Sequence, residues 1–227
     1  MEGAVAIVLA AGGGERLGFP IPKAFVELGG RPMLAHAAVA ALACPGIAAL
    51  VVVVPAGWER AADEHLDLVG PHTVVAGGGT RQASVRAALD VAPSAAPVIV
   101  CHDAARPFAS AGLFAAVLSA LDGVHGVVPV VPVADTVKRV RGDLVDRTED
   151  RAALALAQTP QAFDALALRE AHARAERDAI EVTDDASALE LAGYRVRTIP
   201  GDPVNFKITT AEDLTRAELV ATELARG

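Results

Sequence analysis

Short, uninterrupted runs of apolar residues alternate with longer alanine-rich stretches along the chain. The runs lack regularly spaced polar positions, a pattern that is typical of strands buried on both faces of a sheet. It predicts five such strands, at residues 5–9, 47–54, 72–75, 98–101 and 124–128. Strands of this kind occur mainly in parallel sheets that are covered by helices on both faces.

The alanine-rich stretches between the runs have the length of helices. They predict helices at residues 32–42, 59–68, 81–91 and 112–121. Thr80 suits the N-cap of the third helix, because its side chain can accept a hydrogen bond from a free amide of the first turn. The alternation of strands and helices predicts an α/β fold with a doubly wound, mostly parallel sheet and right-handed crossovers.

This alternation stops between residues 129 and 151, where the sequence predicts a β-hairpin with its turn at 141–143. The hairpin has few apolar residues, and an isolated two-stranded hairpin is marginally stable in water. We therefore expect it either to lie on the protein's own sheet or to project into another subunit. Beyond it the pattern predicts helices at 164–177 and 184–192, a strand at 194–199, and a C-terminal helix that starts with a capping box at 210–213 and continues to 225.

Composition and charge narrow the class of protein. The chain has 227 residues, of which 52% are hydrophobic and 21% charged, so it can bury the core of one α/β domain that spans residues 1–227. The net charge is −8 and the pI about 5.2. A protein that binds nucleic acid non-specifically needs a basic surface, so we expect no nucleic-acid partner.

Cysteines and apolar segments indicate the compartment. The two cysteines, Cys44 and Cys101, are far apart in the sequence, which excludes a disulfide scaffold or a structural zinc site and fits a reducing environment. The longest apolar run, 47–54, ends at Pro55, whereas a membrane-spanning helix needs about 20 residues. The N-terminus has no basic region of the kind that begins a signal peptide. We expect a cytoplasmic protein without a membrane partner.

The first predicted strand leads into a glycine-rich loop, Leu9-Ala-Ala-Gly-Gly-Gly-Glu-Arg-Leu-Gly18, which is followed by Lys23. Gly12 and Gly14 leave room for backbone amides to approach a phosphate. The loop lies at the carboxyl edge of the sheet, where ligands bind in open α/β folds. It does not match the dinucleotide-binding or P-loop patterns, because Leu17 stands where both require glycine.

Motifs along nearly the whole chain carry a family resemblance. The first loop resembles the LAAGxGxRxxxxxPK signature of nucleotidyltransferases. Further motifs follow it: GGGTRQASV at 77–85, HDAARPF at 102–108, DTVKR at 135–139, QTPQ at 158–161, TDDAS at 183–187 and NFKIT at 205–209. Together they resemble the 2-C-methyl-D-erythritol 4-phosphate cytidylyltransferases of the non-mevalonate isoprenoid pathway. Only three of the 20 basic residues are lysines, and all three lie within these motifs.

The resemblance implies a nucleotide-diphospho-sugar transferase-like, Rossmann-type fold and a reaction between CTP and 2-C-methyl-D-erythritol 4-phosphate that releases pyrophosphate. The acceptor phosphate is largely a dianion at neutral pH, because its second pKa is about 6. It therefore needs no general base, and catalysis is expected to rest on positioning and electrostatic stabilisation. Arg16 and Lys23 would stabilise charge on the α-phosphate and pyrophosphate. A Mg²⁺ cofactor would be bound mainly by the CTP phosphates, with no metal site built from the protein.

The resemblance also assigns the remaining site residues. For the nucleotide these are Ala10, Ala11, Gly12, Gly14, Gly78 and Ser84. For the acceptor they are Asp103, Arg106, Thr136, Thr159 and Thr183, with Arg151 and Lys207 expected to position the attacking phosphate. Residues 134–152 are expected to form a dimerisation arm that completes the site of a second copy, which predicts a homodimer.

Several alternatives stay open. Asp103 could cap the turn that follows it, Thr183 could be only the N-cap of the helix at 184–192, and we expect His102 to be structural. A ribitol-5-phosphate cytidylyltransferase of the same fold would share most of the motifs. A nucleotide-binding module without turnover is a further alternative, although the full set of cations argues against it. The length predicts that no second enzyme is fused to this one.

Overall fold

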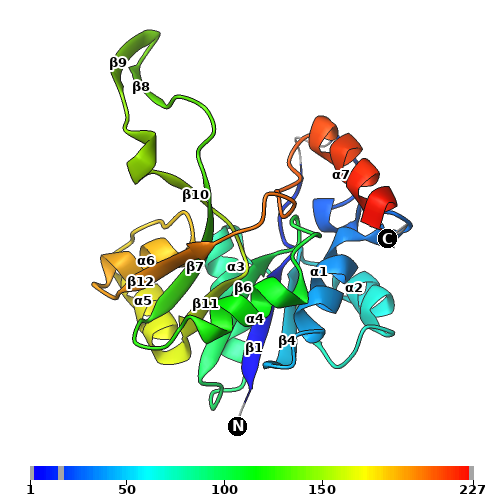
Figure 1. Cartoon of the computed structure of the whole chain (residues 1–227). Helices are drawn as coiled ribbons and strands as arrows, with labels where there is room; N and C mark the ends of the chain where they lie inside the picture. The colour runs from blue at the N-terminus through cyan, green and yellow to red at the C-terminus, as the bar shows by residue number, and fades with distance from the viewer. Residues whose placement is uncertain (1–2, 15–17, 225–227) are drawn as a thin grey trace.

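The computed structural model describes residues 3–14 and 18–224. An eight-stranded sheet lies at its centre, in the order β10-β7-β11-β6-β1-β4-β5, with β12 also paired to β7 (Figure 1). The strands of this sheet are β1 (Ala4–Leu9), β4 (Ile47–Val54), β5 (Thr73–Ala76), β6 (Val98–Asp103), β7 (Gly126–Pro132), β10 (Ala155–Ala157), β11 (Gln161–Asp164) and β12 (Val196–Pro200). The pairs among β1, β4, β5 and β6 and the β12–β7 pair are parallel, whereas β10 and β11 run antiparallel to their neighbours.

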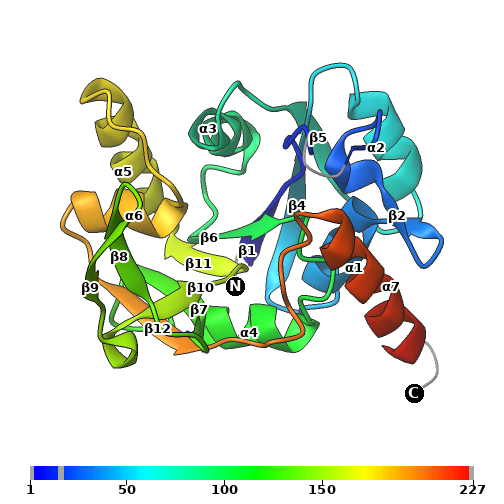
Figure 2. The same cartoon turned by 90° about the horizontal axis from the view of Figure 1, so that it is seen from above.

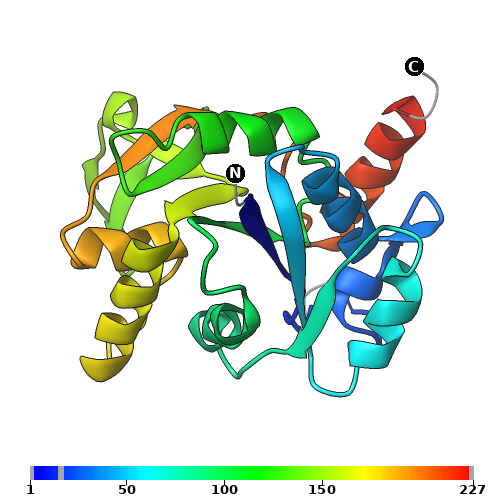
Figure 3. The same cartoon turned by 90° about the horizontal axis from the view of Figure 1, so that it is seen from below.

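Two layers of helices cover the sheet, which explains the uninterrupted apolar runs. In β1, Ala6 and Val8 pack into one core and Val5 and Ile7 into the other. The first core contains α1 (Met33–Leu42), α2 (Glu59–Leu66) and α4 (Ala111–Ser119); the second contains α3 (Arg81–Val91), α5 (Ala165–Arg177) and α6 (Asp185–Leu191). Figures 2 and 3 show α4 and α3 on opposite sides of the sheet. None of the helices within the described ranges has both the length and the apolar character needed to span a membrane.

The predicted doubly wound α/β architecture is confirmed, with corrections at the antiparallel strands. All six strands predicted outside the hairpin and all the predicted helices form, and α3 covers its predicted range. The apolar pattern does not predict β10 and β11, because they are short and poor in β-branched residues. β7 continues beyond residue 128 through Pro129, whose carbonyl still accepts a hydrogen bond from the amide of Gln158 at 2.8 Å.

The predicted hairpin forms a sheet of its own, β8 (Lys138–Arg141) and β9 (Leu144–Thr148). Gly142 in its turn has a φ of +64°, a conformation that is favourable for glycine. Val140, Leu144 and Val145 are 62%, 71% and 61% exposed, and Figure 1 shows the hairpin projecting from the body of the protein. The expectation that it could lie on the protein's own sheet is therefore wrong.

The C-terminal helix α7 (Ala211–Leu224) packs on the short strand β2 (Glu27–Leu28), which pairs with β3 (Arg31–Pro32). Its predicted capping box forms: the Thr210 hydroxyl accepts a hydrogen bond from the Asp213 amide at 3.2 Å, and the Asp213 carboxylate accepts one from the Thr210 amide at 2.9 Å. Residue 225, the predicted end of the helix, lies outside the described residues. Docking of α7 fixes the end of the segment that carries Lys207.

Candidate functional site

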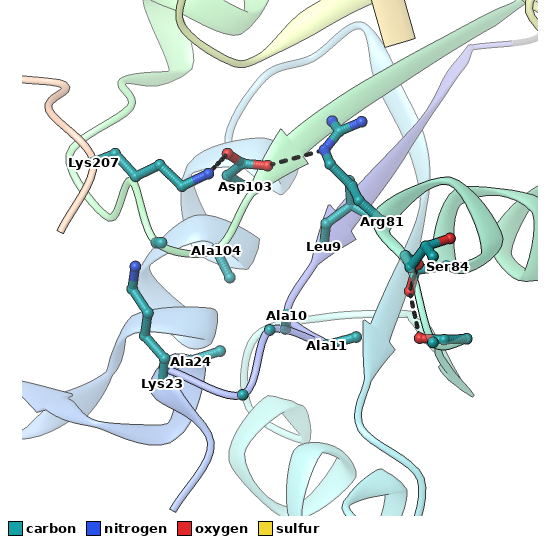
Figure 4. Close-up of a pocket in the computed structure, with 16 residues that line it drawn as sticks. Leu9, Ala10, Ala11, Lys23, Ala24, Arg81, Ser84, Asp103, Ala104 and Lys207 are labelled. Carbon is teal, nitrogen blue, oxygen red and sulfur yellow. Dashed lines mark hydrogen bonds and ion pairs between the residues drawn. The ribbon is translucent and has the colours of Figure 1, made fainter. Parts of the chain in front are cut away.

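A cavity of about 360 Å³ lies at the carboxyl ends of β1 and β6 (Figure 4). Open α/β sheets bind their ligands at this edge. Its wall contains most of the predicted nucleotide-binding and catalytic residues that lie in described parts of the chain. Those of the predicted residues that line it are Ala10, Ala11, Gly12, Lys23, Gly78, Ser84, Asp103 and Lys207. Segments far apart in the sequence therefore meet where the sequence predicts a site.

The first loop brings Lys23 into the cavity. Lys23 begins a 3₁₀ helix, Lys23–Phe25, and Figure 4 shows its side chain directed toward the pair formed by Lys207 and Asp103. Gly14 has a φ of +71°, and a Cβ atom added there would lie 2.5 Å from the Cβ of Lys23. Gly14 does not line the cavity, but its lack of a side chain lets the loop fold back against Lys23. Arg16 lies outside the described residues.

The second glycine-rich segment lies against the first. A Cβ atom at Gly77 would be 2.6 Å from the Cβ of Ala11 and 2.8 Å from the Oγ of Ser84, so only glycine permits this close approach. The predicted N-cap forms, with Thr80 accepting a hydrogen bond from the Ala83 amide at 3.0 Å. The Ser84 hydroxyl donates to the carbonyl of Thr80 at 2.9 Å. Small residues thus leave a narrow space at this end of the cavity.

The opposite wall carries an ion pair. The Nζ of Lys207 donates to the Oδ2 of Asp103 at 2.7 Å. The Nε of Arg81 lies 3.8 Å from the other carboxylate oxygen. Burial alone would raise the pKa of the Asp103 carboxyl, but the charges of Lys207 and Arg81 outweigh it and hold that pKa below its usual value. Asp103 is therefore an anion between two cations, rather than only a cap for the next turn.

Arg81 is a cavity residue that the motif analysis does not single out. Its Nη2 donates to the Oδ2 of Asp185 at 2.7 Å, and the other oxygen of Asp185 lies 3.0 Å from the Nε2 of His172. Asp185 and His172 are buried, at 0% and 1% exposed. The signal available in the sequence is the position of Arg81: directly after the N-cap of a helix that follows a glycine-rich loop at the binding edge.

A second polar group supports Asp103 from behind. The Thr159 hydroxyl accepts a hydrogen bond from the Asp103 amide at 3.0 Å and lies 3.0 Å from the Nδ1 of His102. The other ring nitrogen of His102 lies 3.2 Å from the carbonyl of Arg106. This carbonyl can only accept, so Nε2 carries the proton and Nδ1 accepts from Thr159. His102 is fully buried, as a structural residue should be, and burial lowers its pKa to about 4.

Two predicted acceptor residues lie beside the cavity rather than in its wall. Thr159 is 5% exposed and contacts Asp103 as described above. The guanidinium of Arg106 donates to the carbonyls of Asn205 at 2.9 Å and Ala157 at 3.2 Å. Neither is among the described residues that line the cavity. In this structure Thr159 therefore affects the cavity by binding Asp103, and Arg106 does so by binding the segment that carries Lys207.

Three further predicted residues lie apart from the cavity of their own chain. Thr136 and Arg151 belong to the exposed segment around the hairpin, and an Nη1 donor of Arg151 binds the carbonyl of Ala134 at 2.8 Å. Thr183 is exposed, and it is not an N-cap, because Asp184 caps α6 in a capping box with Ser187. The structure does not bring these three residues together with Lys23 and Asp103.

The cavity's charged groups do not form a metal cage. Over residues 3–14 and 18–224 there is no cluster of three or more histidine, cysteine, aspartate or glutamate side chains that could bind a metal ion. In the described part of the wall, Lys23, Arg81 and Lys207 are cationic and Asp103 is the one carboxylate. An excess of cations at a glycine-lined edge is suited to a polyphosphate.

Comparison with known proteins decides the family. The family model described as 2-C-methyl-D-erythritol 4-phosphate cytidylyltransferase matches residues 4–223. The chain belongs to this family. It is 46% identical over 222 residues to "2-C-methyl-D-erythritol 4-phosphate cytidylyltransferase" of Rhodococcus opacus, covering 96% of this chain and 95% of the relative. The crystal structure of the enzyme of that name from Thermus thermophilus is 38% identical, covers 98% of this chain and 100% of its own, and has a TM-score of 0.80.

Other relatives in the family are longer. The "Bifunctional enzyme IspD/IspF" of Solidesulfovibrio magneticus is 45% identical over 221 residues, which cover 92% of this chain but 54% of the relative. The chain thus spans about half the length of such two-part relatives and nearly all of the single-part ones. Membership of the family also identifies the fold, since the structural relatives superimpose along almost the entire chain.

Proposed function

We propose that this protein transfers a cytidylyl group from CTP to 2-C-methyl-D-erythritol 4-phosphate, forming 4-diphosphocytidyl-2-C-methyl-D-erythritol and pyrophosphate. The observation that carries the proposal is the cavity. Two glycine-rich segments form part of its wall, and the Lys23 side chain points toward the pair Lys207–Asp103. The names of the family and of its relatives of similar length support 2-C-methyl-D-erythritol 4-phosphate as the acceptor and the cytidylyl group as the group transferred.

The narrow end of the cavity suits the nucleotide. Its wall consists of Ala10, Ala11, Gly78 and the Ser84 hydroxyl, which leave space for a flat base and offer backbone groups to its edge. The amides of residues 12–14 and the ammonium of Lys23 would then lie along the triphosphate. Because charge develops on the α-phosphate and on the leaving pyrophosphate, a fixed cation at this place lowers the barrier more than it stabilises the bound substrate. We assign the same role to Arg16.

The opposite wall suits the acceptor. Asp103 is an anionic hydrogen-bond acceptor that can bind hydroxyl groups of a polyol, and Lys207 beside it can bind the phosphate. In-line attack of a phosphate oxygen on the α-phosphorus forms the new P–O bond as the bond to pyrophosphate breaks. The attacking oxygen carries no proton, so no base is required, and Lys207 supplies the charge that lets two anions approach.

A magnesium ion fits this site only as a partner of the nucleotide. The one carboxylate in the described wall, Asp103, is already paired with Lys207, so phosphate oxygens and water would supply most of the ligands, as is usual for Mg²⁺ in such sites. When bound, the ion would neutralise part of the triphosphate charge. The residues of the first loop would orient the triphosphate that binds it.

The exposed hairpin supports a homodimer with shared sites. The arm, residues 134–152, leaves apolar side chains in solvent, and Thr136 and Arg151 lie on it away from their own cavity. In a symmetric dimer each arm could reach the partner's acceptor site, with Thr183 of the partner's body close to the polyol. Thr136 and Arg151 would then position the acceptor phosphate in trans. A cytoplasmic location remains a prediction from composition.

The test is pyrophosphate release from CTP and Mg²⁺, with 2-C-methyl-D-erythritol 4-phosphate and ribitol 5-phosphate as parallel acceptors. Release with the first acceptor alone is the expected result. Release with ribitol 5-phosphate alone would move the acceptor to the second candidate and leave the nucleotide chemistry in place. CTP binding without release from either acceptor would refute the transfer reaction and leave a nucleotide-binding module.

A pair of variants tests the role of the cavity cation. Lys23→Ala should lower turnover by about 10²–10³-fold, as expected for loss of one group that stabilises the transition state. Arg60→Ala removes a cation from the exposed face of α2, where it pairs with Glu64, and should leave turnover unchanged. Equal activity of the two variants would refute the role of Lys23.

A further inference from the structure

Arg81 joins the Asp103 side of the cavity to a buried anion. Its guanidinium donates to Asp185 at 2.7 Å and lies 3.8 Å from Asp103, and Asp185 in turn is bound by His172 at 3.0 Å. Resting on the proposed function, we propose that Arg81 is a positioning residue for the acceptor: anchored on Asp185, it fixes the Asp103 carboxylate for the incoming polyol phosphate. No role in the reaction has been assigned above to Arg81, Asp185 or His172.

The anchor is rigid because of where its members lie. Arg81 is the first residue of α3, Asp185 is the first residue of α6, and His172 lies on α5. Asp185 is fully buried, with one oxygen bound by Arg81 and the other by His172. A buried carboxylate that has two fixed donors cannot move without leaving a charge unpaired. The ion pair with Asp185 therefore holds the Arg81 guanidinium in a fixed position beside Asp103.

The geometry requires arginine rather than any cation. The Nη2 of Arg81 contacts Asp185 while its Nε faces Asp103, so one planar group serves two carboxylates at once. A lysine ammonium is a single point on a flexible chain and cannot occupy both places. Lysine at this position would still neutralise Asp185 but would leave Asp103 with Lys207 alone. Lys207, which already binds Asp103 at 2.7 Å, would then be its single counter-charge, so it would be held more tightly there and would be less available to the phosphate that it is proposed to bind.

The effect should fall on the acceptor and not on the nucleotide. Figure 4 shows the Arg81 side chain directed toward Asp103 and away from Ser84 and Ala11, which lie at the proposed base end. The contacts that shape the base end come from glycines and from the N-cap Thr80, which a change in the Arg81 side chain does not alter. Separate measurements on the two substrates therefore distinguish a positioning residue from a residue that only stabilises the fold.

The decisive variant is Arg81→Lys, compared with Arg86→Lys. Arg86 lies on the same helix and pairs with Glu176, so it joins α3 to α5, whereas Arg81 joins α3 to α6; Arg86 is not among the described residues that line the cavity. Arg81→Lys should lower kcat/KM for the acceptor by about 10²-fold, the loss expected from misplacing a reacting group by about 1 Å. Its dissociation constant for CTP, measured by calorimetry without acceptor, should not change. Arg86→Lys should match the wild type in both measurements.

Asp185→Asn provides the second variant, because it weakens the anchor and leaves Arg81 in the chain. It should lower kcat/KM for the acceptor in the same direction, and the double variant with Arg81→Lys should lose less than the product of the two single losses. If Arg81→Lys unfolds at a temperature far below that of the wild type, the acceptor kcat/KM of Asp185→Asn tests the proposal in its place. Unchanged acceptor kinetics, or an equal loss in CTP affinity, would overturn the positioning role. A wild-type protein without turnover would instead refute the proposed function.

Discussion

The stability of this protein should depend on pH through His102. The ring is fully buried, its Nε2 donates to the carbonyl of Arg106, and its Nδ1 accepts from Thr159. Burial lowers its pKa from 6.5 to about 4, against the opposing attraction of Asp103. A charged imidazole would place a second N–H against Thr159, whose hydroxyl already binds the Asp103 amide. The folded state therefore resists protonation more than the unfolded state does.

The sign and size of the effect follow from this difference. Above pH 6.5 the ring is neutral in both states, so its contribution to stability is constant. As the pH falls through 6.5 the unfolded state binds a proton, whereas the folded state does not until the pH approaches 4. Between about pH 7.5 and about pH 5 the free energy of unfolding should fall by about 2 kcal/mol from this group alone.

Urea unfolding of the wild type and of His102→Gln across this pH range isolates the effect. Glutamine cannot titrate, but its amide can donate to the Arg106 carbonyl and accept from Thr159. The variant should be less stable at neutral pH, because it loses the packing of the ring against Phe114, with centroids 5.2 Å apart. The gap between the two proteins should then narrow by about 2 kcal/mol on acidification.

A gap that stays constant over the whole range would refute this reasoning, because every other titrating group is shared by the two proteins. Direct observation of the ring provides an independent check. The imidazole resonances of His102 should not shift between pH 7.5 and pH 5 in the folded protein, in line with a pKa of about 4. A resonance that titrates near pH 6.5 would show that the ring is not held neutral by burial.

Three further predictions concern packing, assembly and a buried amide. Gly77→Ala should weaken CTP binding about tenfold or more, because its Cβ would lie 2.6 Å from a side chain of the first loop. Gly112→Ala is the control, because its Cβ would meet no atom closer than the Ser110 Oγ at 3.6 Å and Gly112 is not among the described residues that line the cavity; equal losses would contradict the explanation. The double variant Leu144→Lys, Val145→Lys should be a monomer in light scattering, because it places charges on the exposed apolar residues of the arm. Its activity should also fall more steeply on dilution than that of the wild type. An unchanged dimer would exclude the arm as the interface. Asn205→Ala should lower the free energy of unfolding by about 1–3 kcal/mol in urea, since it removes the buried amide that donates to the Thr159 carbonyl at 2.8 Å; an unchanged midpoint would contradict this.

The sheet could be predicted from the sequence because its strands are buried on both faces. The run at 47–54 is apolar throughout, and β4 occupies that range in the structure, with every residue from Leu50 to Val54 buried. β10 and β11 carry no comparable signal: β10 is exposed along its length, and β11 begins with the buried amide of Gln161. Their position depends on pairing with β7 and β6, strands distant in the sequence, and no local pattern records such pairing.

The candidate site could be predicted in part from motifs and from the parallel arrangement of the strands. Lys23, Asp103 and Lys207 belong to motifs, and parallel strands that end at one edge bring such motifs together. Indirect roles are harder to foresee. Thr159 and Arg106 also lie in motifs, but their partners appear only in the structure. The Thr159 hydroxyl accepts from the Asp103 amide, and the Arg106 guanidinium donates to the carbonyl of Asn205, two residues before Lys207. Arg81 and Asp185 also lie in motifs, but no pattern in the sequence indicates that the two side chains form an ion pair.

Asp103 is contacted by Thr159, Lys207 and Arg81, and a physical reason exists for this many polar groups around one carboxylate. Its amide is bound by Thr159, and its two oxygens face Lys207 and Arg81. In the proposed reaction both substrates are anions, and an anion in their site raises the barrier unless its field is offset and its position fixed. The two cations offset the field, and the hydroxyl fixes the backbone. Under the proposed function, the carboxylate would then bind neutral hydroxyl groups without repelling the phosphate beside them, which is the discrimination that a polyol phosphate acceptor would require.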